Sequence, residues 1–292
     1  ARPKPTHSRL TPLQKVVALA DSVAARQLTE PVMPWMWGPA LQGWAFALLQ
    51  ERLGEPRYTA WLDRFCGHYL AERPEVHSSD TAAPALVTYE LERQGDDRYA
   101  SLTGDVVGYV REAPRLAGGA VDHLGTSGYA RFYPDSVWVD SLMMFGVFAA
   151  RWAAEHGDGA LLADAAGQPA EFARLLRDPA SGLWAHSWWA PGWYSRFGRS
   201  DDGGRRFPRN VPWARGNGWV VAALPMLLEA LPAGESAELD ARREEIVVLL
   251  REISAALLLR QRADGSWTTV LAGWPRGYPE VSAAALVACG WF

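Results

Sequence analysis

Asp140 is the first residue whose setting suggests chemistry. It lies in the segment WVDSL at 138–142, and from Val137 to Phe148 the sequence is apolar almost all round, which is typical of a buried helix. Asp135 or Ser136 would cap that helix. Burial disfavours a carboxylate and raises its pKa, which leaves a carboxylic acid able to donate a proton near neutral pH. The alternative is a structural aspartate that binds a neighbouring helix end or an arginine.

Asp80 offers a second carboxyl group. It follows Ser78 and Ser79 before an alanine-rich helix, where serine and aspartate ordinarily cap the helix N-terminus. Because either serine can already serve as the cap, Asp80 is left to point elsewhere. An N-cap and a reactive carboxylate both remain open for this residue.

The segment 212–219, PWARGNGW, places two tryptophans around polar residues. Its two glycines each weaken a helix by up to about 1 kcal/mol relative to alanine, and such glycines usually allow a close approach to the backbone. Trp213 and Trp219 provide aromatic faces, Asn217 is polar, and Arg215 suits a carboxylate. The segment predicts a site for a ring with hydroxyls and a carboxylate; the alternative is a structural helix start with Arg215 in an internal ion pair.

Two further segments, 33–38 and 183–189, are dense in tryptophan. Aromatic stripes mostly form core, and we expect this of Trp35, Trp188 and Trp189. His186 interrupts the second segment and is either a core histidine or a ligand contact. The sequence contains no phosphate-binding loop, dinucleotide-binding fingerprint, HExxH zinc motif or GxSxG nucleophile motif, so neither a metal nor a cofactor is indicated.

The composition describes a folded chain without strong electrostatic partners. The 292 residues are 49% hydrophobic and 21% charged, with a net charge of −4, which excludes disorder and gives no case for nucleic-acid or membrane binding. Two cysteines cannot build a disulfide framework. The first residues have no apolar signal core, so we expect a cytoplasmic protein. Fifteen tryptophans suggest flat apolar platforms with a polar edge.

Helical periodicity runs through most of the chain, and no segment alternates long enough to indicate a large sheet. We expect an irregular arm over 1–10 and short strands near Trp184 and Trp267. The predicted helices cover residues 13–28, 37–53, 58–70, 81–91, 97–111, 136–156, 159–177, 214–231, 236–262 and 279–292.

Two similar turns, LGEPRY and QGDDRY, place Gly54 and Gly95 at helix ends, where glycine suits a left-handed C-cap. Gly157 falls at a comparable junction. Such helical hairpins stack in an open solenoid or a closed toroid, here within one domain. The long segments Pro114–Pro134 and Ala190–Pro212 break this rhythm, and long loops in compact domains are often functional.

The segment WARGNGW at 213–219 resembles the signature of the unsaturated uronyl hydrolases, glycoside hydrolase families 88 and 105. WVDSL at 138–142 is similar to the family motif that carries its essential aspartate. Trp37-Gly38, Ser79-Asp80 and LWAH at 183–186 follow in the family's order, and the likeness runs from about residue 13 to the end.

The resemblance implies an all-α (α/α)6 barrel formed by residues 1–292 as a single domain. It also implies removal of a 4,5-unsaturated uronic acid from the non-reducing end of lyase-generated oligosaccharides, most typically rhamnogalacturonan fragments. Asp140 would protonate C4 of the double bond, and Asp80 would assist the water that adds at C5. The resemblance implies a sugar pocket formed by Trp37, His123, His186, Trp213, Arg215, Asn217 and Trp219.

The chain departs from the family in one respect. Family members normally continue past the segment equivalent to 278–292, and we count about ten helices where a closed toroid needs twelve. Either the count is short, or the last helix pair is missing and leaves apolar surface exposed. A monomer and a homodimer are both compatible with this pattern.

Two other functions compete with the hydrolase. The first is a saccharide-binding toroid without catalysis, or a truncated inactive relative. The second is another α/α-toroid enzyme such as a sugar epimerase, which would rely on paired histidines. With six histidines in the chain and His186 as the well-placed one, the epimerase ranks third.

Overall fold

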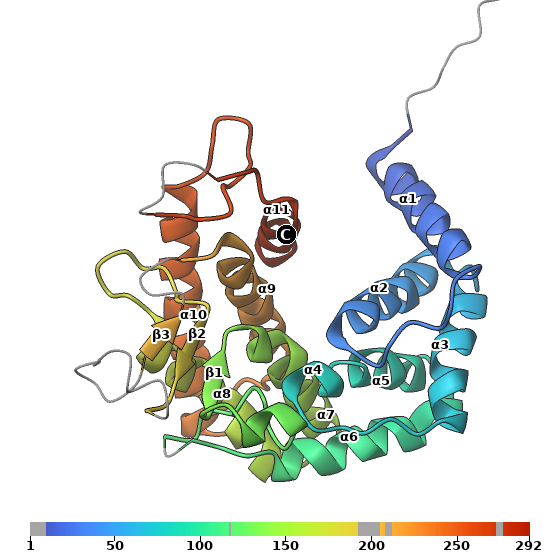
Figure 1. Cartoon of the computed structure of the whole chain (residues 1–292), viewed down its shortest axis with the longest axis horizontal. Coiled ribbons are helices and arrows are strands. Elements are labelled where there is room, and N and C mark those ends of the chain that lie inside the picture. Colours follow the sequence, from blue (N-terminus) through green and yellow to red (C-terminus); the bar gives the residue numbers. More distant parts are fainter. Residues whose placement is uncertain (1–9, 117, 192–204, 208–211, 273–276) are drawn as a thin grey trace, which may run out of the picture. The chain divides into compact units, whose positions relative to one another are not determined.

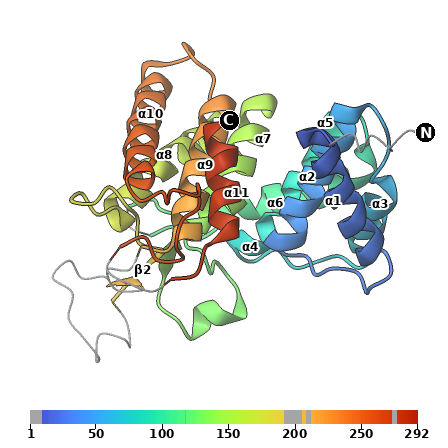
Figure 2. The same cartoon turned by 90° about the horizontal axis from the view of Figure 1, so that it is seen from above.

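The computed structural model describes residues 10–116, 118–191, 205–207, 212–272 and 277–292. Contacts divide the chain into two compact units (Figures 1 and 2). The first unit comprises residues 1–74 and 84–104, and the second comprises 75–83 and 105–292. Within the described ranges, no helix is at once long and apolar enough to span a lipid bilayer.

The first unit consists of helices whose ends follow local rules. Its elements are α1 (Pro12–Gln27), α2 (Trp37–Leu53), α3 (Thr59–Ala71), α5 (Ala85–Arg93) and the 3₁₀ turn η1 (Asp97–Tyr99). Thr11 and Gln14 form a capping box at the start of α1. Gly54 ends α2 with φ 67°, and Gly95 has φ 89°, so the predicted left-handed glycine turns are confirmed. Helix α2 packs against α3 and α5.

The second unit holds the remaining elements, with α6 crossing the boundary at Gly104. In chain order they are α4 (Ser79–Ala82), α6 (Ala100–Glu112), η2 (Gly128–Arg131), β1 (Ser136–Trp138), η3 (Leu142–Val147), α7 (Phe148–His156), α8 (Gly159–Leu176), β2 (Ser187–Trp189), β3 (Arg205–Phe207), α9 (Ala214–Ala230), α10 (Ala237–Leu258) and α11 (Val281–Trp291). Gly157 ends α7 with φ 68°, as predicted.

Helix α9 forms the centre of the second unit's core. It packs against α10, α11 and η3, and the ribbon shows it beside α10 and α11 in both views (Figures 1 and 2). The contact with α11 is close because glycine leaves room: a Cβ at Gly290 would clash with the carbonyl oxygen of Val221. Leu224 and Leu227 are fully buried.

A small antiparallel sheet with the order β1-β2-β3 corrects part of the helix prediction. Ser136–Trp138 forms β1 rather than the start of a helix over 136–156, because it pairs with β2, Ser136 opposite Trp189 and Trp138 opposite Ser187. Neither Asp135 nor Ser136 is therefore a helix cap. The strand expected near Trp184 is confirmed as β2, and tertiary pairing has overridden the helical pattern before Asp140.

The helix predicted over 81–91 is also divided in two. Short α4 ends at Ala82 and α5 begins at Ala85. Pro84 stands between them and lacks the N–H that a continuous helix would need. Ser79 to Ala82 consequently forms a separate turn, which carries Asp80.

Candidate active site

Asp140 lies two residues after the end of β1, at the beginning of the helical run that continues as η3, a π-helix. Such turns are rare and are frequent at functional sites. Only 18% of the Asp140 side chain is exposed, and this burial raises the pKa of its carboxyl group to about 7. Its own backbone N–H, the charge of Arg215 and the Trp219 indole act in the opposite direction. A substantial fraction of Asp140 therefore stays protonated near neutral pH, as a general acid requires.

Asp80 lies in the first turn of α4 but is not its cap. The Ser78 hydroxyl accepts the Thr81 backbone N–H, and the Thr81 hydroxyl bonds back to the Ser78 N–H. Burial and, to a smaller extent, the negative charge of Asp140 together raise the pKa of Asp80 to about 7. The two carboxyl groups are therefore close enough to interact, and each disfavours ionisation of the other.

A histidine accompanies each carboxyl group. His123 Nε2 lies 3.8 Å from Asp80 Oδ1, and His186 Nδ1 lies 3.4 Å from Asp140 Oδ2. Burial and, to a smaller extent, His186 together lower the pKa of His123 to about 3. Burial and, to a smaller extent, the charge of Arg215 together lower the pKa of His186 to about 4. Both rings are neutral at pH 7, so these contacts are not ion pairs.

Trp138 joins the two histidines and was not among the predicted pocket residues. Its ring stacks on His123 with centroids 4.6 Å apart and meets His186 edge-on at 5.1 Å. The Trp138 indole N–H donates to Ser136 Oγ over 3.0 Å, which fixes the ring on β1. The signal available in the sequence was its position two residues before Asp140.

The segment 213–219 packs against His186 on another side of its ring. Trp213 meets the His186 ring edge-on with centroids 4.7 Å apart. The guanidinium of Arg215 lies 3.9 Å from the centre of the Trp213 ring, a cation–π contact. A Cβ at Gly216 would lie 3.2 Å from His186 Nδ1, so the glycine permits the close approach that the sequence suggested.

Asn217 is fully buried, and among the described residues its side chain bonds to backbone groups. Its amide oxygen accepts from the Trp184 N–H, and its NH₂ donates to the carbonyls of Trp184 and Trp213. A contact of Asn217 with sugar stays a prediction. Trp219 is 4% exposed and lies at the Asp140 carboxyl group. Trp219 therefore favours the ionised form of Asp140, and its place in a sugar pocket stays a prediction.

One predicted pocket residue belongs to the other compact unit. Trp37 is the first residue of α2, in the first unit, whereas the other eight candidates belong to the second unit. A role for Trp37 in a sugar pocket stays a prediction. Most of the long segment Ala190–Pro212 lies outside the described residues.

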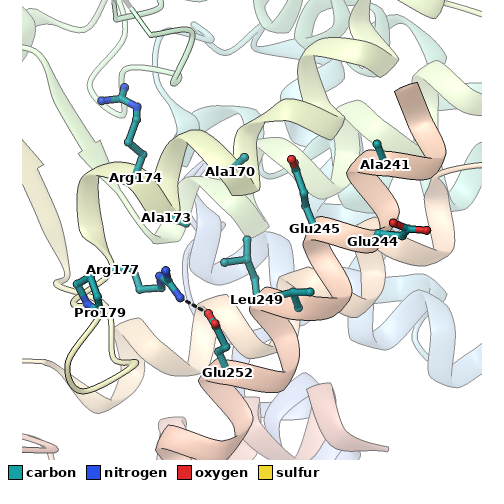
Figure 3. A pocket seen from close by; sticks show the side chains of 11 residues that line it. Ala170, Ala173, Arg174, Arg177, Pro179, Ala241, Glu244, Glu245, Leu249 and Glu252 are labelled. Atoms are coloured by element: carbon teal, nitrogen blue, oxygen red, sulfur yellow. Dashed lines mark hydrogen bonds and ion pairs between the residues drawn. The ribbon is translucent and has the colours of Figure 1, made fainter. Parts of the chain in front are cut away.

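A separate groove of about 730 Å³ lies between α8 and α10 (Figure 3). An ion pair between Arg177 and Glu252 spans it, and Leu249 contributes to its floor. None of the predicted site residues lines this groove. Among the described residues, no cluster of three or more His, Cys, Asp or Glu side chains is arranged to hold a metal ion.

Two interacting carboxyl groups of raised pKa, each beside a neutral histidine and near aromatic and cationic side chains, form the kind of cluster that is typical of enzyme active sites. The sequence profile of Glycosyl Hydrolase Family 88 matches residues 15–291. The chain belongs to this family and is a glycosidase.

Individual relatives agree with the family. The chain is 26% identical over 281 residues to the unsaturated rhamnogalacturonyl hydrolase YesR of Bacillus subtilis. The matched stretch covers 94% of this chain and 75% of that protein. A shorter stretch of 81 residues is 35% identical to an unsaturated 3S-rhamnoglycuronyl hydrolase of an Alteromonas species, covering 27% of this chain and 18% of that protein.

A solved structure establishes the fold. A possible member of family GH105 from Klebsiella pneumoniae superposes with a TM-score of 0.75 at 24% identity, covering 99% of this chain and 75% of that one. The unsaturated glucuronyl hydrolase of Bacillus sp. GL1 gives 0.74 at 16% identity, with 95% and 76% covered. The predicted all-α (α/α)6 fold class is confirmed.

Proposed function

We propose that this glycosidase removes 4,5-unsaturated uronic acid from the non-reducing end of oligosaccharides left by polysaccharide lyases. The observation that carries the proposal is the pair Asp140 and Asp80, whose pKa values are both raised to about 7. An enol ether is protonated at carbon, which is slow without a positioned undissociated acid. Membership of the family and the name of the YesR relative support the same substrate class.

In the proposed mechanism Asp140 donates its proton to C4 of the unsaturated ring. The new C–H bond leaves positive charge shared between C5 and the ring oxygen, which the carboxylates stabilise electrostatically. Water then forms a bond to C5 and passes one proton to the carboxylate pair, which restores the acid. The resulting hemiketal opens and expels the leaving sugar.

The surrounding residues serve this reaction in three ways. The neutral rings of His123 and His186 can bond to hydroxyl groups without adding charge. Arg215 supplies a cation suited to the uronate carboxylate. Trp213, which is half-buried, offers an apolar edge to the ring.

The leaving sugar is proposed to be rhamnose of a rhamnogalacturonan fragment. The support is the relative YesR, whose name specifies a rhamnogalacturonyl substrate and which matches 94% of this chain. Glycosaminoglycan-derived disaccharides are the alternative, because the Bacillus sp. GL1 structure belongs to an enzyme that degrades glycosaminoglycan.

The decisive experiment incubates the protein with unsaturated disaccharides from rhamnogalacturonan lyase and, separately, from glycosaminoglycan lyases. Loss of the ultraviolet absorbance of the double bond reports hydration, and chromatography identifies the released sugar. We expect faster loss with the rhamnogalacturonan disaccharide and no release from the saturated analogue. Binding without absorbance loss would instead identify a non-catalytic saccharide-binding protein.

A further inference from the structure

Each carboxyl residue of the site has a serine as its chain neighbour, and the two serines are bonded to each other. Ser79 precedes Asp80 on α4, and Ser141 follows Asp140. The Ser141 hydroxyl donates to Ser79 Oγ over 2.8 Å, and both side chains are essentially fully buried. Ser141 Oγ also lies 2.9 Å from His123 Nδ1. The bonded chain therefore runs from Ser79 through Ser141 to His123.

The direction of these bonds determines where the His123 proton lies. A serine hydroxyl has one proton, and that of Ser141 is directed to Ser79. Toward His123 Nδ1, Ser141 can only accept, so the ring proton must lie on Nδ1. A neutral imidazole carries one proton, so Nε2 presents a lone pair, and it lies 3.8 Å from Asp80 Oδ1.

The His123 ring cannot easily turn away from this arrangement. Its backbone N–H donates to the Ser136 carbonyl over 2.8 Å, and its own carbonyl accepts the Ser79 N–H over 3.1 Å. The Trp138 ring stacks on its face at 4.6 Å with an interplanar angle of 12°. Only 4% of His123 is exposed, so water does not compete for Nδ1.

We propose that Ser79 and Ser141 are positioning residues that hold His123 as its Nδ1–H tautomer, so that Nε2 acts as a proton acceptor facing Asp80. A lone pair beside Asp80 favours its protonated form, whereas an Nε2–H would favour the carboxylate. Two other titratable groups act on the pair of Asp80 and His123: the charge of Asp140 acts on Asp80, and His186 acts on His123. The charge of Arg215 acts in turn on His186. The catalytic consequence rests on the proposed function, but the tautomer does not.

The test reads the tautomer directly by nitrogen-15 NMR of the ligand-free protein near pH 6.5. We expect His123 to show the Nδ1–H pattern. In Ser79→Ala, Ser141 loses its acceptor and can turn its proton toward Nδ1, so we expect the Nε2–H pattern. The titration midpoint of Asp80, followed by carbon-13 NMR, should then fall, by less than one pH unit because 3.8 Å is longer than a hydrogen bond.

Two further variants separate this role from a merely structural one. Ser141→Ala removes the acceptor of Nδ1 and should lower the Asp80 midpoint in the same direction. Ser127→Ala is the matched control, because Ser127 is also buried in the second unit but its hydroxyl has no hydrogen-bond partner among the described residues. We expect no change in the His123 pattern or the Asp80 midpoint in that control.

The Nε2–H pattern in the unmodified protein would overturn the proposal, as would an unchanged pattern in both Ser79→Ala and Ser141→Ala. These results are independent of turnover. A protein that hydrolyses no unsaturated uronide but shows the expected tautomer contradicts the proposed function alone. An active protein with the opposite tautomer contradicts the positioning role alone.

Discussion

His186 Nδ1 faces Asp140 Oδ2 across 3.4 Å, and neither atom has a hydrogen-bond partner among the described residues. Buried polar atoms are normally satisfied, so two unsatisfied atoms beside each other mark a place where a water or a ligand hydroxyl can bond to both. Because the pKa of His186 is lowered to about 4 and that of Asp140 is raised to about 7, the contact joins a neutral ring to a carboxylic acid over pH 5–6.

The first prediction concerns the alkaline limb of the activity profile. Asp140 must be protonated to donate, and its pKa of about 7 means that deprotonation begins near neutrality. We expect kcat/KM to fall above about pH 7, by roughly tenfold for each further pH unit. Initial rates of absorbance loss between pH 4 and 9 measure this. A rate that stays constant up to pH 9 would contradict the assignment of Asp140 as the acid.

Removing the carboxyl group should abolish most turnover. Asp140→Asn retains the size of the side chain but cannot donate an acidic proton, and we expect kcat to fall by about 10²–10⁴-fold. The exposed Asp135, five residues earlier, provides a control: Asp135→Asn should leave kcat unchanged. Turnover of Asp140→Asn within a few-fold of the unmodified enzyme would remove Asp140 from the mechanism.

Asp140→Asn, which should lower kcat, should raise the thermal stability of the protein at neutral and alkaline pH. The folded pKa of about 7 lies above the ordinary value of 3.8, so the native state binds the proton more tightly than the unfolded chain does. That contribution is present below about pH 4 and is lost as the pH rises to about 7. Asn has no such loss, so the Tm advantage of Asp140→Asn should grow by about 5 °C between pH 4 and 8. Calorimetry of both proteins at the two pH values measures this change. A Tm difference that is the same at pH 4 and pH 8 would contradict the prediction.

Gly216 sets how closely α9 approaches His186. A Cβ there would meet His186 Nδ1 at 3.2 Å and Val139 Cγ2 at 3.3 Å, both at the Asp140 contact. We expect Gly216→Ala to lower kcat by about tenfold or more, since small displacements of catalytic groups are costly. Gly167 in α8 has nothing within 4 Å of its Cβ position, so Gly167→Ala should leave kcat unchanged and stabilise the helix by about 0.4–1 kcal/mol. Equal kinetics for the two variants would show that the approach at Gly216 is unimportant.

Sequence reasoning succeeded where local rules decide the structure. Side-chain chemistry within a few residues explains the glycine-ended turns and the boundaries of α2. It also explains why a serine caps α4, so that Asp80 is not needed as the cap. Sequence reasoning failed at 136–138, where pairing with β2, about fifty residues later, overrides a helical pattern. No local pattern reveals the Ser79–Ser141 bond either, because it joins residues 62 positions apart.

The last prediction concerns Asn217, whose amide holds the Trp184 backbone against α9. Asn217→Ala would remove the partners that the Asn217 side chain offers to the Trp184 N–H and the Trp184 carbonyl in a fully buried setting, at a cost of about 1–3 kcal/mol for each unsatisfied group. The Trp213 carbonyl keeps the backbone N–H of residue 217 as a donor. We expect Asn217→Ala to lower the free energy of unfolding by several kcal/mol, on the order of 3. Asn217→Asp retains the acceptor for the Trp184 N–H and loses the donors, so urea denaturation of both variants separates the two contributions. Gln261→Ala is the control, because it removes an exposed hydrogen bond from the Gln261 side-chain amide to the Gly265 carbonyl. Water can replace that partner, so this substitution should cost less than about 0.5 kcal/mol. If Asn217→Ala were as mild as that control and instead raised KM, the amide would belong to the sugar pocket after all.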